Sequence, residues 1–317
     1  MLTGIAKMAR DGAVLDQKTL VEYIELPTRS YISRCRNPAM PFEWMINPYR
    51  GCEFGCKYCY ARYTHEFMEF HDSAAFERKI FAKLWDEAAF RREIDRFPYG
   101  TTLAIGTATD PYQPAERRYR VTRRMLEVFA SRKGWNLSIT TKSNLVERDL
   151  EVYRRLMEHN RLTVNMTVTT TDAKLARLLE PMAPRPDLRL QAVQRLTLAG
   201  VPCGVFAIPI VPGITDSAAS IEAVIQAAAE SGAQYFGANL LFLQPCALRV
   251  FIPFLEKEFP ALADAYLRRF SRYAYLRGAY AERIHERVVT IRERYGLKSR
   301  PVEKQLVPGQ LSLDFRG

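Results

Sequence analysis

Three cysteines on one short segment are the side chains of this sequence best suited to metal chemistry. Cys52, Cys56 and Cys59 follow a C-x3-C-x2-C spacing. Three thiolates spaced in this way can hold three irons of a cubane iron–sulfur cluster, which leaves the fourth iron open to another ligand. Gly51 and Gly55 allow the segment to curl so that the three sulfurs point inward. The spacing therefore predicts a cluster site with one open coordination position.

Zinc is the alternative for the same cysteines. A structural zinc ion needs four ligands, usually supplied as two close pairs. His65 and His71 lie near enough in the sequence to supply a fourth ligand, whereas the next cysteine is Cys203. Disulfide bonds are not expected, because the chain is long and shows no secretion signal.

The residues around the cysteines resemble those of a known family. Residues 47–62, NPYRGCEFGCKYCYAR, and residues 106–118, GTATDPYQPAERR, are similar to the radical SAM enzymes, in particular to their spore photoproduct lyase-like branch. The resemblance runs from about Asn47 to Pro245. It implies that Cys52, Cys56 and Cys59 bind a [4Fe-4S] cluster and that S-adenosylmethionine chelates the open iron. One electron from an external donor would then cleave the cofactor to methionine and a 5′-deoxyadenosyl radical, which abstracts a hydrogen from the substrate.

The elements that must position this loop follow a β/α alternation. An earlier strand is expected at 21–26, and six strands separated by helices are expected from residue 42 onward, at 42–46, 102–106, 136–141, 162–169, 205–211 and 235–243. Strands that alternate with helices pair in parallel. Right-handed crossovers would curl six such strands into an open barrel, which matches the partial (β/α)6 TIM-like barrel that the resemblance implies.

The pattern changes after the sixth strand. Three helices are expected at 248–257, 261–276 and 278–295, with no further strand. We therefore expect an α/β chain in four parts: an N-terminal extension (1–41), the partial barrel (42–246), a basic helical extension (247–297) and a tail (298–317).

Polar side chains at the ends of the expected strands are the candidates for binding the cofactor, because ligands collect at the carboxyl ends of parallel barrel strands. In the family resemblance, Thr109 matches a contact to the cofactor's amino group. Lys142 and Thr169 match contacts to its carboxylate or ribose, and Ile208 matches a backbone contact to adenine. The cofactor-binding candidates are Tyr58, Tyr60, Thr107, Thr109, Lys142, Ser143, Thr169 and Ile208. For each threonine the alternative is ordinary strand propensity.

Three further residues have two interpretations each. Cys246 is expected to end the sixth strand and to face the site, where it would be a catalytic hydrogen donor or a buried free thiol. Spore photoproduct lyases carry their donor cysteine elsewhere in the chain, so this sequence departs from their pattern. Cys203 is expected to begin its strand as a core residue, and Arg189 is either a second carboxylate clamp or a surface charge.

The charge balance favours an anionic partner. The 317 residues carry 46 Lys and Arg against 35 Asp and Glu, a formal net charge of +11. A strongly basic chain attracts nucleic acid. The arginines of the expected C-terminal helices form either a basic clamp or a solvated face.

Our leading hypothesis is a radical SAM enzyme that acts on nucleic acid or a nucleotide-like substrate, as in DNA repair. The alternatives are modification of a peptide or small metabolite and a non-catalytic metal-binding nucleic-acid module.

The last residues suggest a docking peptide. A motif by which bacterial DNA-processing proteins bind the sliding clamp is similar to Gln310, Leu311, Leu313 and Phe315. The same alternation also suits a final strand packed on the protein itself.

No apolar run is long enough to span a membrane. We expect a cytoplasmic monomer, since its six cysteines suit a reducing compartment.

Overall fold

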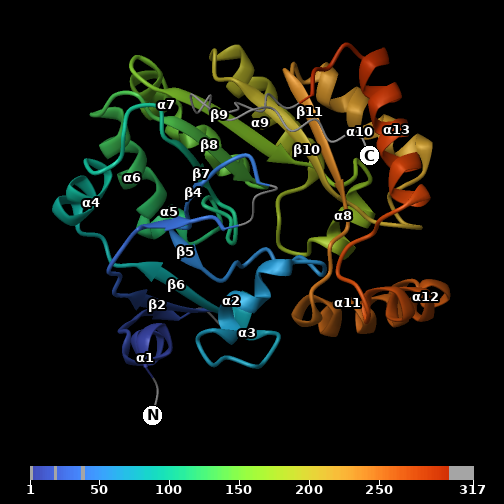
Figure 1. The fold of residues 1–317 in the computed structure, drawn as a ribbon, viewed down its shortest axis with the longest axis horizontal. Coiled ribbons are helices and arrows are strands. Elements are labelled where there is room, and N and C mark those ends of the chain that lie inside the picture. Colours follow the sequence, from blue (N-terminus) through green and yellow to red (C-terminus); the bar gives the residue numbers. More distant parts are fainter. Residues whose placement is uncertain (1–2, 18–19, 37–39, 300–317) are drawn as a thin grey trace, which may run out of the picture.

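The computed structural model describes residues 3–17, 20–36 and 40–299. Its largest element is a seven-stranded sheet in the order β11-β10-β9-β8-β7-β4-β3 (Figure 1). The strands are β3 (Ile32–Arg34), β4 (Trp44–Ile46), β7 (Thr102–Ile105), β8 (Asn136–Thr141), β9 (Arg161–Thr167), β10 (Cys203–Ile210) and β11 (Tyr235–Leu240). From β4 to β11 every neighbouring pair is parallel, and only β3 runs antiparallel to its neighbour. The expected α/β fold with six parallel strands is therefore confirmed.

Helices connect the parallel strands and pack on the sheet, as the alternation predicts (Figure 1). They are α4 (Glu87–Ile94), α6 (Val121–Ala130), α7 (Leu150–Met157), α9 (Pro186–Leu198) and α10 (Ala218–Glu230), with the short α5 (Glu116–Tyr119), η2 (Asn144–Asp149) and α8 (Ala173–Leu179). The main core lies between these helices and the sheet, and β10 is buried along nearly its whole length. Such strands read as continuous apolar runs, which is why the sequence locates them.

A second, four-stranded sheet has the order β1-β2-β6-β5. Its strands are β1 (Val14–Gln17), β2 (Glu22–Leu26), β5 (Tyr49–Arg50) and β6 (Lys79–Lys83). β2 pairs in parallel with β6, so residues of the expected N-terminal extension are hydrogen-bonded to a strand that follows the cysteines. The helix α1 (Gly4–Asp11) packs on this sheet through Ala9, which joins Ile24 and Leu26 in a small core.

Three helices end the described chain, as expected: α11 (Pro245–Glu258), α12 (Pro260–Phe270) and α13 (Ala279–Arg294). The expected second helix ran to residue 276, but α12 ends at Phe270. In Figure 1 α13 lies beside α10, whereas α11 and α12 lie on the side of α2 (Tyr63–Glu66) and α3 (Ala75–Arg78). Within the described ranges no helix is long and apolar enough to cross a membrane.

The sixth strand is shorter than predicted. β11 ends at Leu240 rather than at residue 243, and the chain then turns into α11. Cys246 therefore lies in the first turn of a helix that begins with Pro245, not at a strand end. Proline suits that position because its missing N–H would be unpaired there in any case.

Candidate active site

The loop that carries the three cysteines joins β5 to the short helix η1 (Tyr60–Arg62), and backbone hydrogen bonds fix it to two other segments. Cys52 N donates to Phe76 O at 2.9 Å, and Lys57 N donates to Leu179 O at 2.9 Å. Gly51 has a φ of 80°, and a Cβ there would lie 2.7 Å from Lys79 O. Glycine is therefore required at this point of the loop by both conformation and space.

The three thiols lie in an apolar surrounding. Cys52 and Cys56 belong to a core that also contains residues of α11 and α12, and Cys59 packs against it. Burial raises the pKa of all three thiols, that of Cys56 to about 12. Thiols in such a place ionise only when a metal stabilises the thiolate. The donor set therefore suits iron, and the desolvation strengthens the binding of each thiolate to it.

The cysteines are not grouped as ligands of one ion. In the described part of the chain, no three His, Cys, Asp or Glu side chains are close enough together to hold a single metal ion. In a cubane cluster each thiolate binds a different iron, and the assignment of Cys52, Cys56 and Cys59 as its ligands stays a prediction.

The histidines offered for the zinc alternative have other partners. His65 is 1% exposed, its Nε2 is 2.9 Å from Lys79 O, and its ring packs against Phe76 and Phe81. His71 is exposed and lies beside Glu69. His65 borders the cysteine loop, since its Cε1 would lie 3.1 Å from a Cβ at Gly51. In the described residues, however, neither histidine joins the cysteines in a group that could hold a metal ion, so the structure gives the zinc alternative no support.

A buried charge cluster lies against the cysteine loop. Glu180 Oε2 is 2.5 Å from Arg189 Nη2, and both side chains are 1% exposed. Glu180 Oε1 accepts hydrogen bonds from Tyr58 Oη and, at 2.7 Å, from Thr169 Oγ1. Burial by itself raises the pKa of Glu180, but the cations of Arg189 and Lys142 outweigh it and hold that pKa below its usual value.

This cluster corrects the sequence analysis in two ways. The surface interpretation of Arg189 is wrong, because its guanidinium is buried and also donates to Thr167 O and Pro184 O. Glu180 was missed altogether, and a single glutamate after a helix gives no signal in the sequence by which it could have been found.

Lys142 is the cation of this cluster that is open to a ligand. Its Nζ is 4.0 Å from Glu180 Oε1 and 5.8 Å from the centre of the Tyr58 ring, and its side chain is 17% exposed. Asp110 fixes the end of β8 beneath it, accepting from Lys142 N at 2.7 Å and from Thr141 Oγ1 at 2.7 Å. Asp110 is thus a positioning residue for Lys142.

The other strand-end candidates have structural partners. Thr109 Oγ1 donates to Gly51 O at 2.6 Å, Thr107 Oγ1 is 3.0 Å from Asn47 Nδ2, and Ser143 Oγ caps η2. Ile208 lies where the pairing of β10 with β11 shifts register. Thr107 and Thr109 follow β7 and Ser143 follows β8, whereas Ile208 lies two residues before the end of β10. The contacts of these four residues with a cofactor stay predictions.

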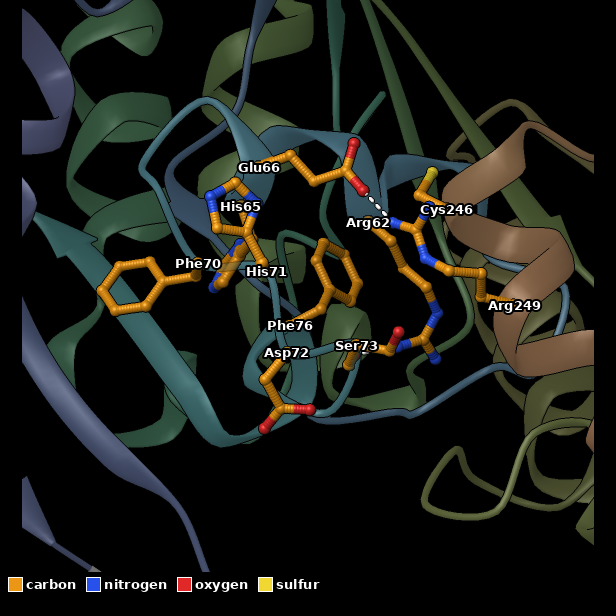
Figure 2. Close-up of a pocket in the computed structure, with 10 residues that line it drawn as sticks. All are labelled: Arg62, His65, Glu66, Phe70, His71, Asp72, Ser73, Phe76, Cys246 and Arg249. Atoms are coloured by element: carbon orange, nitrogen blue, oxygen red, sulfur yellow. Dashed lines mark hydrogen bonds and ion pairs between the residues drawn. The ribbon is translucent and has the colours of Figure 1, made fainter.

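Cys246 contacts the backbone of Tyr60 rather than its ring. Its Sγ is 3.7 Å from Tyr60 O, whereas the Tyr60 hydroxyl donates to Thr107 O. Figure 2 shows Cys246 beside a small cavity with Arg62 and with the ion pair of Glu66 and Arg249. The cavity has a volume of about 10 Å³, close to what one water molecule needs, so it does not admit a cofactor. A hydrogen-donor role for Cys246 stays a prediction.

The C-terminal arginines divide between two places. On α13, Arg287 Nη1 donates to Asp216 O and Arg294 pairs with Glu222, so both face the side of α10. On α12, Tyr266 Oη donates to Pro212 O, which follows the carboxyl end of β10. This contact anchors α12 near the carboxyl end of β10, and Arg268 and Arg269 of that helix are exposed. The residues expected to bind a sliding clamp lie outside the described residues.

Comparison with known proteins identifies the sequence family. The family model described as the Radical SAM superfamily matches residues 46–224. An uncharacterized protein of Mycobacterium tuberculosis is 33% identical over 304 residues, which cover 92% of this chain and 88% of that protein. An uncharacterized protein of Methanocaldococcus jannaschii is 26% identical over 241 residues, covering 76% and 85% of the two chains.

Solved structures give the fold. A spore photoproduct lyase mutant with bound AdoMet and dinucleoside spore photoproduct superposes with a TM-score of 0.66 and 17% identity, covering 86% of this chain and 79% of that one. At this identity the likeness is one of fold.

Proposed function

The chain belongs to the radical SAM superfamily, whose enzymes use a [4Fe-4S] cluster and S-adenosylmethionine, and we propose that Cys52, Cys56 and Cys59 hold that cluster. The observation that carries the proposal is the set of three thiols, those of Cys52 and Cys56 buried and that of Cys59 partly buried, on a loop whose backbone is fixed from two sides. When bound, the cluster supplies the electron that cleaves S-adenosylmethionine and so generates the 5′-deoxyadenosyl radical. The chain's own residues bind and orient that cofactor.

Lys142 is the proposed partner of the cofactor carboxylate. Its ammonium is partly open, and its pKa is raised above the usual value because Cys56 and Glu180 outweigh the effect of burial. Glu180 in turn is held by Arg189, so the lysine is not fully neutralised by a single carboxylate. Tyr58 lies under the Lys142 ammonium, and its hydroxyl donates to Glu180, so this buried ring helps to hold the lysine in place.

The six parallel strands are proposed to curve into a partial (β/α)6 barrel with its mouth at the cysteine loop. Contacts between the ends of separate strands support this. Asp110, after β7, holds the end of β8 through Lys142 N, and Tyr58 of the loop contacts Thr169, after β9. Ligands of parallel barrels bind where strand ends meet in this way.

Nucleic acid is the proposed substrate. The support is a net charge of +11 and the exposed arginines of α12, a helix anchored near the carboxyl end of β10. The solved relative named above was crystallised with a dinucleoside, which suits the same class. Neutralising phosphates releases counterions, so such binding should weaken steeply with salt.

The first test measures the chemistry. Anaerobically reconstituted protein, reduced with dithionite, should release 5′-deoxyadenosine from S-adenosylmethionine, and each of Cys52→Ala, Cys56→Ala and Cys59→Ala should lose bound iron and that activity. Cys203→Ala is the control, because Cys203 is buried at the start of β10. Full activity in any loop variant would contradict the proposal, and iron binding without 5′-deoxyadenosine would favour a non-catalytic module.

The second test measures the substrate class. Binding of a labelled DNA oligonucleotide is followed by anisotropy at several salt concentrations. A linear fall of log K with log[salt] is expected for phosphate contacts. Binding that does not respond to salt would remove nucleic acid as the substrate while leaving the radical chemistry in place.

A further inference from the structure

Five aromatic rings from three separate chain segments form one continuous row beside the cysteine loop. The row runs Phe67, Tyr63, Tyr60, Phe242, Tyr275, and we call it the aromatic row. Successive ring centres are 5.5, 6.5, 5.9 and 4.3 Å apart. The first three rings belong to or adjoin η1 and α2, whereas Phe242 follows β11 and Tyr275 follows α12. Because Tyr60, the middle ring, directly follows Cys59, the row passes the cysteine loop at its centre.

The row is partly open to solvent along its length. Phe67 is 64% exposed, Tyr60 39% and Tyr275 50%, and the two rings between them are half-buried. Contiguous apolar surface that is bordered by polar residues often marks an interaction site. Rings that a core needed would be covered, as Tyr58 and Phe76 are.

Positive charge borders the row. Arg269 Nη2 is 3.4 Å from Tyr275 O, and Arg272 and Arg277 are exposed on either side of Tyr275 in the sequence. At the other end, the exposed Arg249 pairs with Glu66 of α2, next to Phe67. The row is therefore an aromatic surface bordered by guanidinium groups at both ends.

Flat rings combined with cations match the chemistry of unpaired nucleotides. Bases stack on aromatic side chains whatever their sequence, while phosphates bind the neighbouring cations. In a duplex the base faces are covered by their neighbours and cannot reach such a surface. A peptide has no regular negative charge for the arginines.

We propose that the aromatic row stacks the bases of a single-stranded nucleic-acid segment and leads it to the cysteine loop. This inference rests on the proposed nucleic-acid substrate and adds the strandedness and the binding surface. The row passes from η1 to the loop after α12, so the C-terminal helices contribute part of the substrate site.

The experiment compares ring removal with ring retention. Tyr275→Leu and Phe67→Leu remove the two end rings at exposed positions, Tyr275→Phe keeps the ring, and Tyr99→Leu is the control. Tyr99 is 85% exposed and precedes β7, at the opposite end of the strands. The full-length protein is titrated against labelled oligothymidylate and against a DNA duplex, and folding is checked by circular dichroism.

Each leucine variant should weaken oligothymidylate binding by about 5- to 150-fold, the factor that corresponds to roughly 1–3 kcal/mol per stacked base. The salt slope should stay unchanged in these variants, whereas Arg272→Gln should lower it by about one phosphate contact. Tyr275→Phe and Tyr99→Leu should bind oligothymidylate as tightly as wild type does. None of the aromatic variants should change the affinity for the duplex.

Two outcomes would overturn the inference, and they differ in what else they remove. In the first outcome, wild-type affinity for oligothymidylate falls with salt and both leucine variants bind as tightly as wild type. The row is then not the binding surface, but nucleic acid remains the proposed substrate. If wild type releases 5′-deoxyadenosine but binds neither oligonucleotide, the inference and the substrate both fail and the radical chemistry remains.

Discussion

Replacing Arg189 by methionine should destabilise the protein far more than an ordinary surface substitution. Met approximates the length of the arginine stem but leaves Glu180 without its closest cation, 2.5 Å away, in a place where both side chains are 1% exposed. It also leaves Thr167 O and Pro184 O without the donors that now reach them. Buried carboxylates and carbonyls that lose their partners retain the full cost of desolvation.

The magnitude follows from that geometry. Removing one partner of a buried ion pair costs about 3–5 kcal/mol. With an unfolding entropy of about 2.1 cal/mol/K per residue over 317 residues, each kcal/mol lowers Tm by about 1.5 °C. Arg189→Met should therefore lower Tm by about 5–8 °C. Thermal unfolding followed by far-UV circular dichroism measures this shift.

A double-mutant cycle separates the ion pair from the lost packing. Glu180→Gln removes the charge that Arg189→Met leaves uncompensated, so the double variant should be more stable than the sum of the two single effects by about 2 kcal/mol.

Arg185→Met is the matched control. It lies four positions before Arg189 and pairs with Asp187, with side chains 60% and 45% exposed. Exposed ion pairs contribute little, so Tm should change by less than about 1 °C. If Arg189→Met shifts Tm no more than Arg185→Met does, the ion pair is not a buried structural element and the reasoning is refuted.

Three further predictions concern the loop, the cofactor and pH. Gly51→Ala should lose bound iron after reconstitution, because its Cβ would lie 2.7 Å from a carbonyl oxygen. In Gly55→Ala the nearest atom would be 3.9 Å from the Cβ, so this variant should retain iron and lose only about 1–2 kcal/mol of folding stability through its positive φ. Lys142→Met should weaken S-adenosylmethionine binding at least about tenfold by calorimetry, while the exposed Lys133→Met should not. Burial lowers the pKa of His65 from 6.5 to about 4. The contribution of the neutral ring to the free energy of unfolding is therefore fully present above pH 6.5, and it falls by about 3 kcal/mol as the pH drops toward 4. His65→Leu should flatten this part of the profile when the urea midpoint is measured against pH.

Each of these has a contrary result. Equal iron retention in the two glycine variants would mean that the loop backbone has room at both positions. Equal cofactor affinity in the two lysine variants would place the carboxylate elsewhere. A pH profile that His65→Leu leaves unchanged would show that another group controls the acid limb.

Local sequence patterns were sufficient for much of the fold. The apolar run that became β10 and the β/α alternation each depend on neighbours within a few residues, and both led to features that the structure contains. The strand-end rule likewise selected Lys142, because parallel strands bring their carboxyl ends to one edge. The exact end of β11 was missed, since Leu241 and Leu243 continue the apolar run after the pairing stops.

The sequence by itself therefore determined which reactive groups are present: three thiols on one short loop, the strands that hold the loop, and a positive balance of charge. Only the tertiary structure decided the partners. It joined Glu180 to Arg189 and Tyr58, packed α11 and α12 against the cysteine loop, and aligned Tyr60 with Phe242 and Tyr275. These contacts join segments far apart in the chain. A residue's type and spacing fix the face it presents, whereas its partner across the fold depends on how all the elements pack together.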